Sequence, residues 1–335
     1  MNRRTWHITL TRLVPALPGG RWISGTGICA TLLLGFWVAG VFGADYLEQP
    51  GASYSAALFF SVIIAYIVPM FHFICERTHA ALDQLRGVLD IDADQLAACQ
   101  QRIYRKPIVW FVVVLALGNL AWILQSLMLF GSPAEFFHQV SESAAVAAVV
   151  LGTVLVWNVM TLVLGALIDS ARLFGHVARY ARVELLDPAR LRPFANIAVL
   201  STLSIIGAQA AFPIMLLQSE LDSAAFVPGF IATSVPLVLL AVLPVWPVHA
   251  RIAAAKQALL ETLNQRIAEL PAPDPRRPES LARLAPLLTY RREILQAPEW
   301  PFDMGNLTRL GLYLIIPPLT WIGAALIEHL VDSLF

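Results

Sequence analysis

The sequence predicts an all-α, polytopic integral membrane protein of seven transmembrane helices, with the N-terminus in the cytoplasm and the C-terminus outside. Three observations predict this class. The chain is 58% hydrophobic and only 14% charged, whereas soluble domains carry about a quarter charged residues. It contains long apolar runs at regular intervals. Its basic residues lie only in the N-terminal tail and in alternate connections between these runs, as described below.

The apolar runs are long enough to cross a bilayer as helices, because about 20 residues span the hydrocarbon core. A helix also satisfies its own backbone groups in lipid. The first run follows several arginines and ends in "VFGAD", which resembles a signal-peptidase site, but it is longer than a signal peptide's apolar region of about 7–15 residues. We therefore expect an uncleaved first span. The predicted spans are 22–43, 54–75, 107–130, 143–168, 194–217, 224–248 and 309–330.

The orientation follows from the placement of basic residues. All 23 Lys and Arg residues lie within 1–21, 76–106, 169–193 and 249–309. The alternate connections and the last five residues contain none. Because cytoplasmic loops carry the Lys/Arg excess, the four basic segments are predicted to be cytoplasmic.

The opposite side carries acidic residues without basic ones. A negative outer surface can concentrate cations at a mouth, and Glu328 and Asp332 are candidate acids of such a mouth. The alternative is that these acids only solvate short loops. The outer acids are Asp45, Glu48, Glu135, Glu142, Glu220, Asp222, Glu328 and Asp332.

The cytoplasmic segments 76–106, 169–193 and 249–308 have helical periodicity. We expect them to extend the membrane helices into a bundle, or else to lie on the membrane as amphipathic helices. The stretch "DIDADQ" lacks the glycine and the final acid of a calcium-binding EF-hand loop. Asp92 and Gln95 instead match a capping box at a helix start.

No motif predicts catalysis. The chain has no nucleotide-binding, metalloprotease or nucleophile-elbow motif. Its three cysteines form no CxxC pair, and its histidines have no metal-binding spacing. We expect no enzyme activity, no catalytic residue, no metal, no cofactor and no nucleic-acid partner.

Uncharged polar residues within the spans are the first candidate site. Asn119, Asn158 and Gln209 lie in the third, fourth and fifth predicted spans. Such residues commonly hydrogen-bond neighbouring helices. The alternative is that they line a pathway or a ligand pocket.

The last span is the second candidate. Pro317 and Pro318, with Thr320 close by, interrupt it. Proline in a helix interior leaves backbone carbonyls without their usual partners, and broken membrane helices often line ion or substrate sites. The stretch "EWPFD" before this span predicts a hinge at Trp300, Pro301 and Asp303.

The predicted topology is similar to that of insect odorant and gustatory receptor channels. That resemblance covers topology and the cytoplasmic helical layer, and no motif assigns a role to a residue. The segment "WPFD" resembles segments of bacterial inner-membrane proteins. We therefore expect a multi-pass protein of a bacterial inner (plasma) membrane, with the lipid bilayer as its solvent.

Three function classes remain open. The leading hypothesis is an oligomeric, cation-preferring channel or pore-like transport protein with the proline-broken last helix near the pathway. Its expected partners are further copies of the chain and a small molecule or ion. The alternative is a receptor or signalling module that senses a ligand or recruits a partner through 249–308. A secondary carrier is disfavoured, because no span has a charge near its middle.

Overall fold

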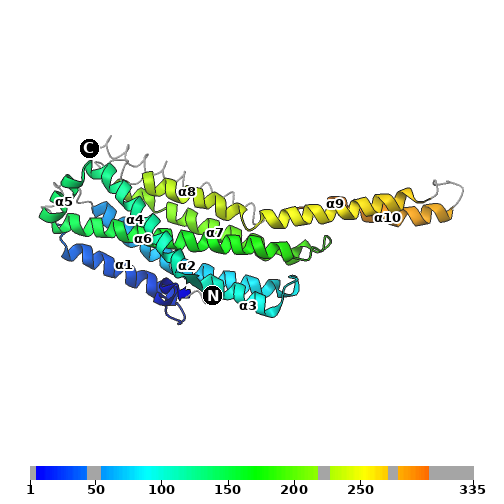
Figure 1. Ribbon diagram of the computed structural model, residues 1–335, viewed down its shortest axis with the longest axis horizontal. Helices are drawn as coiled ribbons and strands as arrows, with labels where there is room; N and C mark the ends of the chain where they lie inside the picture. Colours follow the sequence, from blue (N-terminus) through cyan, green and yellow to red (C-terminus); the bar gives the residue numbers. More distant parts are fainter. Residues whose placement is uncertain (1–4, 44–53, 218–226, 271–277, 302–335) are drawn as a thin grey trace, which may run out of the picture.

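The protein is a long bundle of α-helices (Figure 1). The computed structural model describes residues 5–43, 54–217, 227–270 and 278–301. Besides the α-helices, these residues form short 3-10 turns (η) and a two-stranded ribbon. The helices are α1 Gly20–Val38, α2 Tyr54–Gln84, α3 Ala93–Tyr104, α4 Ile108–Phe130, α5 Pro133–Glu142, α6 Ala144–Val177, α7 Arg192–Gln209, α8 Val227–Val242, α9 Trp246–Ala268 and α10 Pro278–Gln296.

Six helical segments among the described residues are long and apolar enough to cross a membrane. This confirms the class of helical membrane protein. The seventh predicted span, 309–330, lies outside the described residues. The six segments are Gly20–Val38, Tyr54–Gly87, Ile108–Phe130, Ala144–Tyr180, Ala189–Met215 and Pro228–Ala268.

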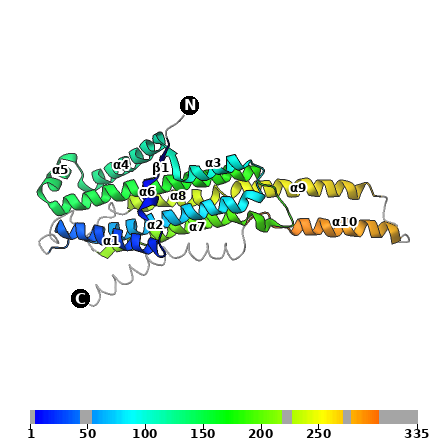
Figure 2. The ribbon, with the colours of Figure 1, turned by 90° about the horizontal axis from the view of Figure 1, so that it is seen from below.

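Helices α2 and α6 form the centre of the bundle (Figures 1 and 2). α1 packs on α2, α4 packs on α6, and α7 packs against α2 and α8. α1 and α4 are therefore peripheral, and most of their apolar side chains are exposed, as Trp22 at 81% and Met128 at 65% illustrate. Large apolar groups on an outer face are expected where lipid, rather than water, is the solvent.

The central helices continue beyond their predicted spans and pack together there. Leu89, after α2, pairs with Ala181, after α6, in an antiparallel backbone bridge. The Asp90 and Arg182 side chains form an ion pair beside it at 2.8 Å. Arg251 of α9 donates to the Ala181 carbonyl at 3.1 Å. The helix extensions thus form a packed layer at one end of the molecule.

A short ribbon joins the N-terminal segment to this layer. β1 (Thr5–His7) pairs antiparallel with β2 (Arg105–Pro107). The ribbon was not predictable from the sequence, because each strand is only three residues long. At the start of α3, Asp92 and Gln95 form the predicted capping box.

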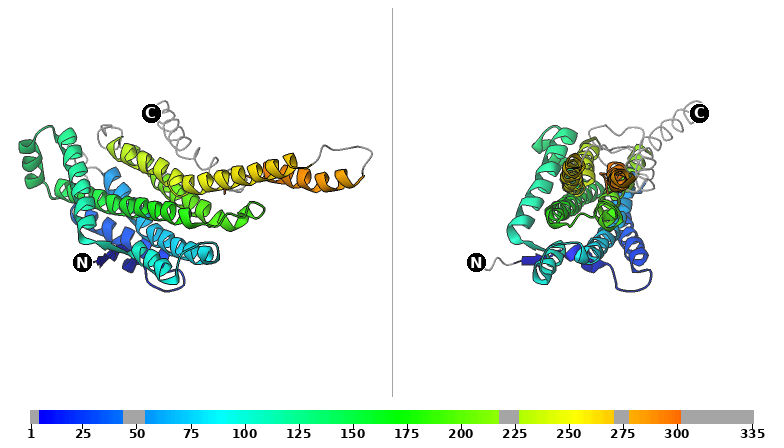
Figure 3. Two further views of the ribbon diagram at one scale, coloured as in Figure 1. Left: turned by 45° about the vertical axis from the view of Figure 1, so that its right-hand side comes forward. Right: turned by 90° about the vertical axis from the view of Figure 1, so that its right-hand side faces the viewer.

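α9 and α10 project from the bundle as a helical hairpin (Figures 1 and 3). The predicted sixth span divides here: α8 ends at Val242 and α9 begins at Trp246. Pro244 lies within this break and Pro247 lies in the first turn of α9, and neither can donate a helical hydrogen bond. The fifth predicted span also differs, since α7 ends at Gln209 and a 3-10 turn, η6 (Phe212–Leu217), contains Pro213.

Candidate functional site

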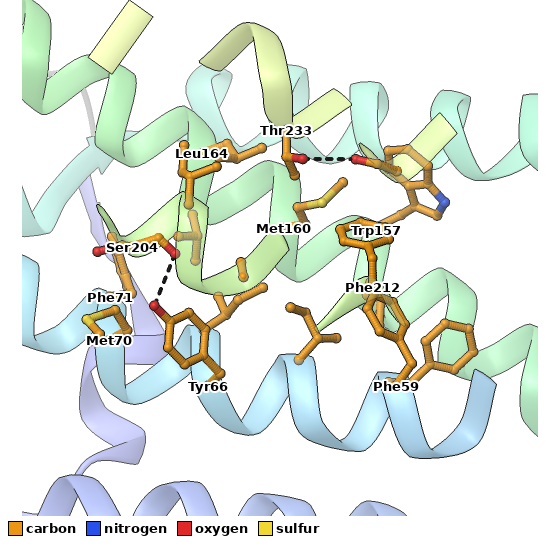
Figure 4. A pocket seen from close by; sticks show the side chains of 18 of the residues that line it. Phe59, Tyr66, Met70, Phe71, Trp157, Met160, Leu164, Ser204, Phe212 and Thr233 are labelled. Atoms are coloured by element: carbon orange, nitrogen blue, oxygen red, sulfur yellow. Dashed lines mark hydrogen bonds between the residues drawn. The ribbon is translucent and has the colours of Figure 1, made fainter. Parts of the chain in front are cut away.

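A narrow apolar cavity lies among α2, α6, α7 and α8 (Figure 4). It holds about 70 Å³. Its wall runs from Phe59 to Ile74 on α2 and from Thr153 to Leu167 on α6. At about 1.5 Å per residue, each stretch is roughly 21 Å long. The residues of the wall therefore extend over roughly 21 Å along the helices.

The composition of the wall suits an apolar guest. Nine of the 23 lining residues are aromatic or methionine, among them Phe59, Trp157 and Met160 (Figure 4), and most of the others are aliphatic. Methionine adapts its shape to irregular guests. Apolar cavities with few polar groups are the usual form of small-molecule sites.

Polar groups on the wall are held by hydrogen bonds. The Tyr66 hydroxyl points toward α7 and donates to the Ser204 carbonyl at 3.1 Å (Figure 4). Trp157 Nε1–H donates to the Gln125 side-chain oxygen of α4. Thr233 of α8 donates to the Phe230 carbonyl at 2.9 Å. These bonds fix the wall without placing a charge in it.

Two glycines let large side chains approach the neighbouring helices. A Cβ at Gly207 would lie 2.2 Å from the Tyr66 hydroxyl oxygen. A Cβ at Gly152 would lie 2.6 Å from the Phe60 ring. Any other residue at these positions displaces a ring that lines the cavity.

No protein-family model, curated protein or solved structure matches this chain.

The predicted polar residues of the spans hydrogen-bond neighbouring helices. Asn119 of α4 donates to the Asn158 side chain of α6 at 3.1 Å. Gln209 of α7 is buried and donates to Thr233 and Ser234 of α8 at 3.1 and 3.3 Å. Of these, only Thr233 lines the cavity. A pathway role for Asn119, Asn158 and Gln209 stays a prediction.

The predicted hinge lies at the base of the α9–α10 hairpin. The Trp300 ring stacks on His249 of α9, with centroids 3.9 Å apart. His249 Nδ1–H donates to the Glu299 carbonyl at 3.0 Å. Pro301, which follows Trp300 in the chain, is buried. Asp303, Pro317, Pro318, Thr320, Glu328 and Asp332 lie outside the described residues.

A buried ion pair joins the ribbon to α6. The Lys106 side chain of β2 is almost fully buried and pairs with Asp169. Arg102 also donates to Asp169, at 3.0 Å, and Lys106 lies 5.7 Å from the Trp110 ring centroid. Burial lowers the pKa of the Lys106 ammonium, and the Asp169 carboxylate opposes that lowering. No group of three metal-binding side chains occurs within the described ranges.

The cavity residues were not foreseen from the sequence. Phe59, Met160 and Ile205 are apolar residues within apolar runs, and a packed core has the same composition. The one sequence feature that relates to the cavity is the presence of small residues such as Gly207 in spans whose neighbours carry large aromatic residues.

Proposed function

We propose that this protein is a membrane receptor or signalling module that binds a slender apolar molecule in the cavity between α2, α6, α7 and α8. The cavity carries the proposal. Its lining segments extend over roughly 21 Å along α2 and α6, and this extent and the uncharged wall suit a long-chain fatty acid or a molecule of similar form. Of the two leading function classes that the sequence left open, the described geometry supports ligand sensing best.

The central helices supply the route from ligand to readout. α2 and α6 line the cavity and then continue to the packed layer. There the Leu89–Ala181 bridge joins their ends, and Arg251 connects α9 to the same point. A guest that shifts α2 against α6 changes this junction and the base of the α9–α10 hairpin. The hairpin is the proposed contact for a downstream partner.

The predicted orientation belongs to this proposal: seven spans, N-terminus inside and C-terminus outside. Contacts between the basic segments support it. β1 pairs with β2, and Arg21 pairs with Glu76, so segments predicted to be cytoplasmic meet at one end of the bundle. In this orientation the hairpin lies in the cytoplasm.

A photoactivatable palmitic acid analogue tests ligand binding with the full-length protein. We expect specific labelling of 59–74 and 153–167 that excess palmitic acid displaces. Ala208→Phe, which fills the cavity, removes this labelling. Ala116→Phe, on the exposed face of α4, is the matched control and preserves it. Labelling confined to outer helix faces and equal in both variants would contradict the proposal.

A cation channel built around 309–330 is the second candidate. One observation favours it: α5 exposes Glu135 and Glu142 on the predicted outer side, and 131–142 contains no Lys or Arg. Bilayer recordings with the purified protein test it. We expect cation-preferring currents, and Glu328→Gln with Asp332→Asn lowers the preference. Silent bilayers across salts and voltages exclude this candidate.

A further inference from the structure

A second, wider depression lies on the lateral surface of the bundle, between α1, α2, α6 and the N-terminal segment. It holds about 640 Å³. Ile23, Gly27 and Leu32 of α1 form one side, Ile64 and Val68 of α2 form its floor, and Leu155 of α6 forms part of the opposite side. We call this depression the α1 groove.

The α1 groove has the length of one bilayer leaflet. From Ile23 to Leu32 its α1 wall runs roughly 14 Å, at about 1.5 Å per residue. Half of the hydrocarbon core is about 15 Å. The groove starts at the end of α1 that the basic residues place in the cytoplasm. Its apolar part therefore matches acyl chains of the cytoplasmic leaflet.

One charged residue lines the groove, and it lies at that end. Arg12, in η1 (Thr9–Leu13), is exposed and forms no ion pair with any described residue. Guanidinium groups bind phosphates through paired donors. Basic groups beside membrane helices on the cytoplasmic side recognise anionic head groups. Arg12 can therefore bind a phosphate group of a molecule whose acyl chains lie in the groove.

Ser24 provides an independent observation. It lines the groove one turn into α1, and only 7% of its surface is exposed. Its hydroxyl has no hydrogen-bond partner among the described residues. Serines in a helix normally satisfy themselves on a carbonyl of the preceding turn, and an unmade hydrogen bond in an apolar setting is costly. This unpartnered donor at the groove wall is available to an acceptor of a bound molecule.

We infer that the α1 groove is a binding site for one anionic phospholipid of the cytoplasmic leaflet. The phosphate binds Arg12, an ester carbonyl accepts from Ser24, and the acyl chains lie along Gly27 and Leu32. This site is separate from the central cavity and does not depend on the function proposed for it.

Native mass spectrometry of the full-length protein tests the site, with phosphatidylglycerol and phosphatidylcholine of equal chain length as probes. We expect one phosphatidylglycerol to bind more tightly than phosphatidylcholine. Arg12→Gln weakens that binding about fivefold, the effect of one basic residue near a head group. Arg172→Gln removes an equally exposed charge from α6 and is the matched control, with unchanged binding.

A second pair of variants tests the apolar part without disturbing the fold. A Cβ at Gly27 would meet no atom within 4 Å, and the same holds for a Cβ at Gly35 of the same helix, outside the groove. Gly27→Phe fills the groove and removes the tight phosphatidylglycerol, whereas Gly35→Phe retains it.

Three results overturn the inference. Equal losses in Arg12→Gln and Arg172→Gln show only general attraction to an anionic surface. Unchanged binding in Gly27→Phe shows that the groove is not the site. A cross-link from Thr31→Cys to residues 309–330 shows that the chain's own last segment fills the groove.

Discussion

At the scale of single residues, the buried cation at Lys106 needs a counter-charge. It joins β2 to α6 through Asp169, and Arg102 shares that carboxylate. A buried pair adds little net stability, but a buried charge that has lost its partner is costly. Asp169 is therefore needed to hold the N-terminal ribbon against the bundle.

Asp169→Asn leaves Lys106 buried without a counter-charge. We expect a loss of about 3 kcal/mol, the lower end of the range for broken buried pairs, because Asp169 keeps some contact with solvent. Thermal unfolding in detergent measures it as a lower melting temperature. Lys106→Met combined with Asp169→Leu removes both charges and recovers most of the loss. An unchanged melting temperature in Asp169→Asn would show that the pair is not needed.

Gly207→Ala tests the close approach of Tyr66 to α7. The added methyl group would lie 2.2 Å from the Tyr66 hydroxyl oxygen, so the ring moves into the cavity. Overpacking of this kind costs about 1–3 kcal/mol, and we also expect reduced labelling by the palmitic acid analogue. Tyr66→Phe removes the oxygen and restores part of both losses in the double variant. If Gly207→Ala lowers stability and labelling equally in the presence of Tyr66 and of Tyr66→Phe, the strain does not arise from the Tyr66 hydroxyl.

At the scale of elements, the hairpin of α9 and α10 is fixed at its base by one lysine. Lys256 is buried and donates to the carbonyls of Leu295 and Ala297 at 2.9 and 3.0 Å. It also pairs with Glu299 at 3.2 Å. A cation at this place satisfies the last carbonyls of α10 and interacts favourably with the helix dipole.

Lys256→Met keeps the aliphatic stem and removes these bonds. Unpaired backbone carbonyls cost about 1–3 kcal/mol, so the end of α10 opens more often. We expect amide hydrogen exchange over 294–300 to be about tenfold faster. Gln257→Met, at the exposed neighbouring position, is the control and leaves exchange unchanged. Protection equal to that of the unaltered protein would assign the stability of the base to the His249–Trp300 stack.

Long periodic elements were predictable from the sequence, because a bilayer demands long apolar helices. The predicted starts of the second to fourth spans differ from those of α2, α4 and α6 by at most one residue. The divisions near Pro213 and Pro244 were missed because proline does not always end a membrane helix. α8 continues through Pro236 and α2 through Pro69.

The candidate sites were less predictable, for a physical reason. In lipid, polar residues that bind a neighbouring helix and polar residues that line a pathway have the same identity and spacing. Asn119 and Asn158 show the first behaviour in their mutual hydrogen bond. The cavity and the β1–β2 ribbon depend on contacts between residues far apart in sequence, which periodicity does not encode.

At the scale of the whole molecule, the cavity and the packed layer are parts of the same helices. α6 runs unbroken from Ala144 to Val177, so a displacement at Trp157 reaches the Ala181 junction without crossing a loop. α2 does the same toward Leu89. Whether this layer faces the cytoplasm decides which partners the hairpin can meet.

Cysteine accessibility tests that orientation. In a background without Cys29, Cys75 and Cys99, one cysteine is introduced at Ala97 of α3 or at Ala134 of α5, both exposed alanines. Because Lys and Arg mark the cytoplasmic side, we expect a membrane-impermeant maleimide to label Ala134→Cys in intact cells. Ala97→Cys should react only after permeabilisation, which also serves as the control for its reactivity. The reverse pattern would invert the topology and place the hairpin, the layer and Arg12 of the α1 groove on the outer side.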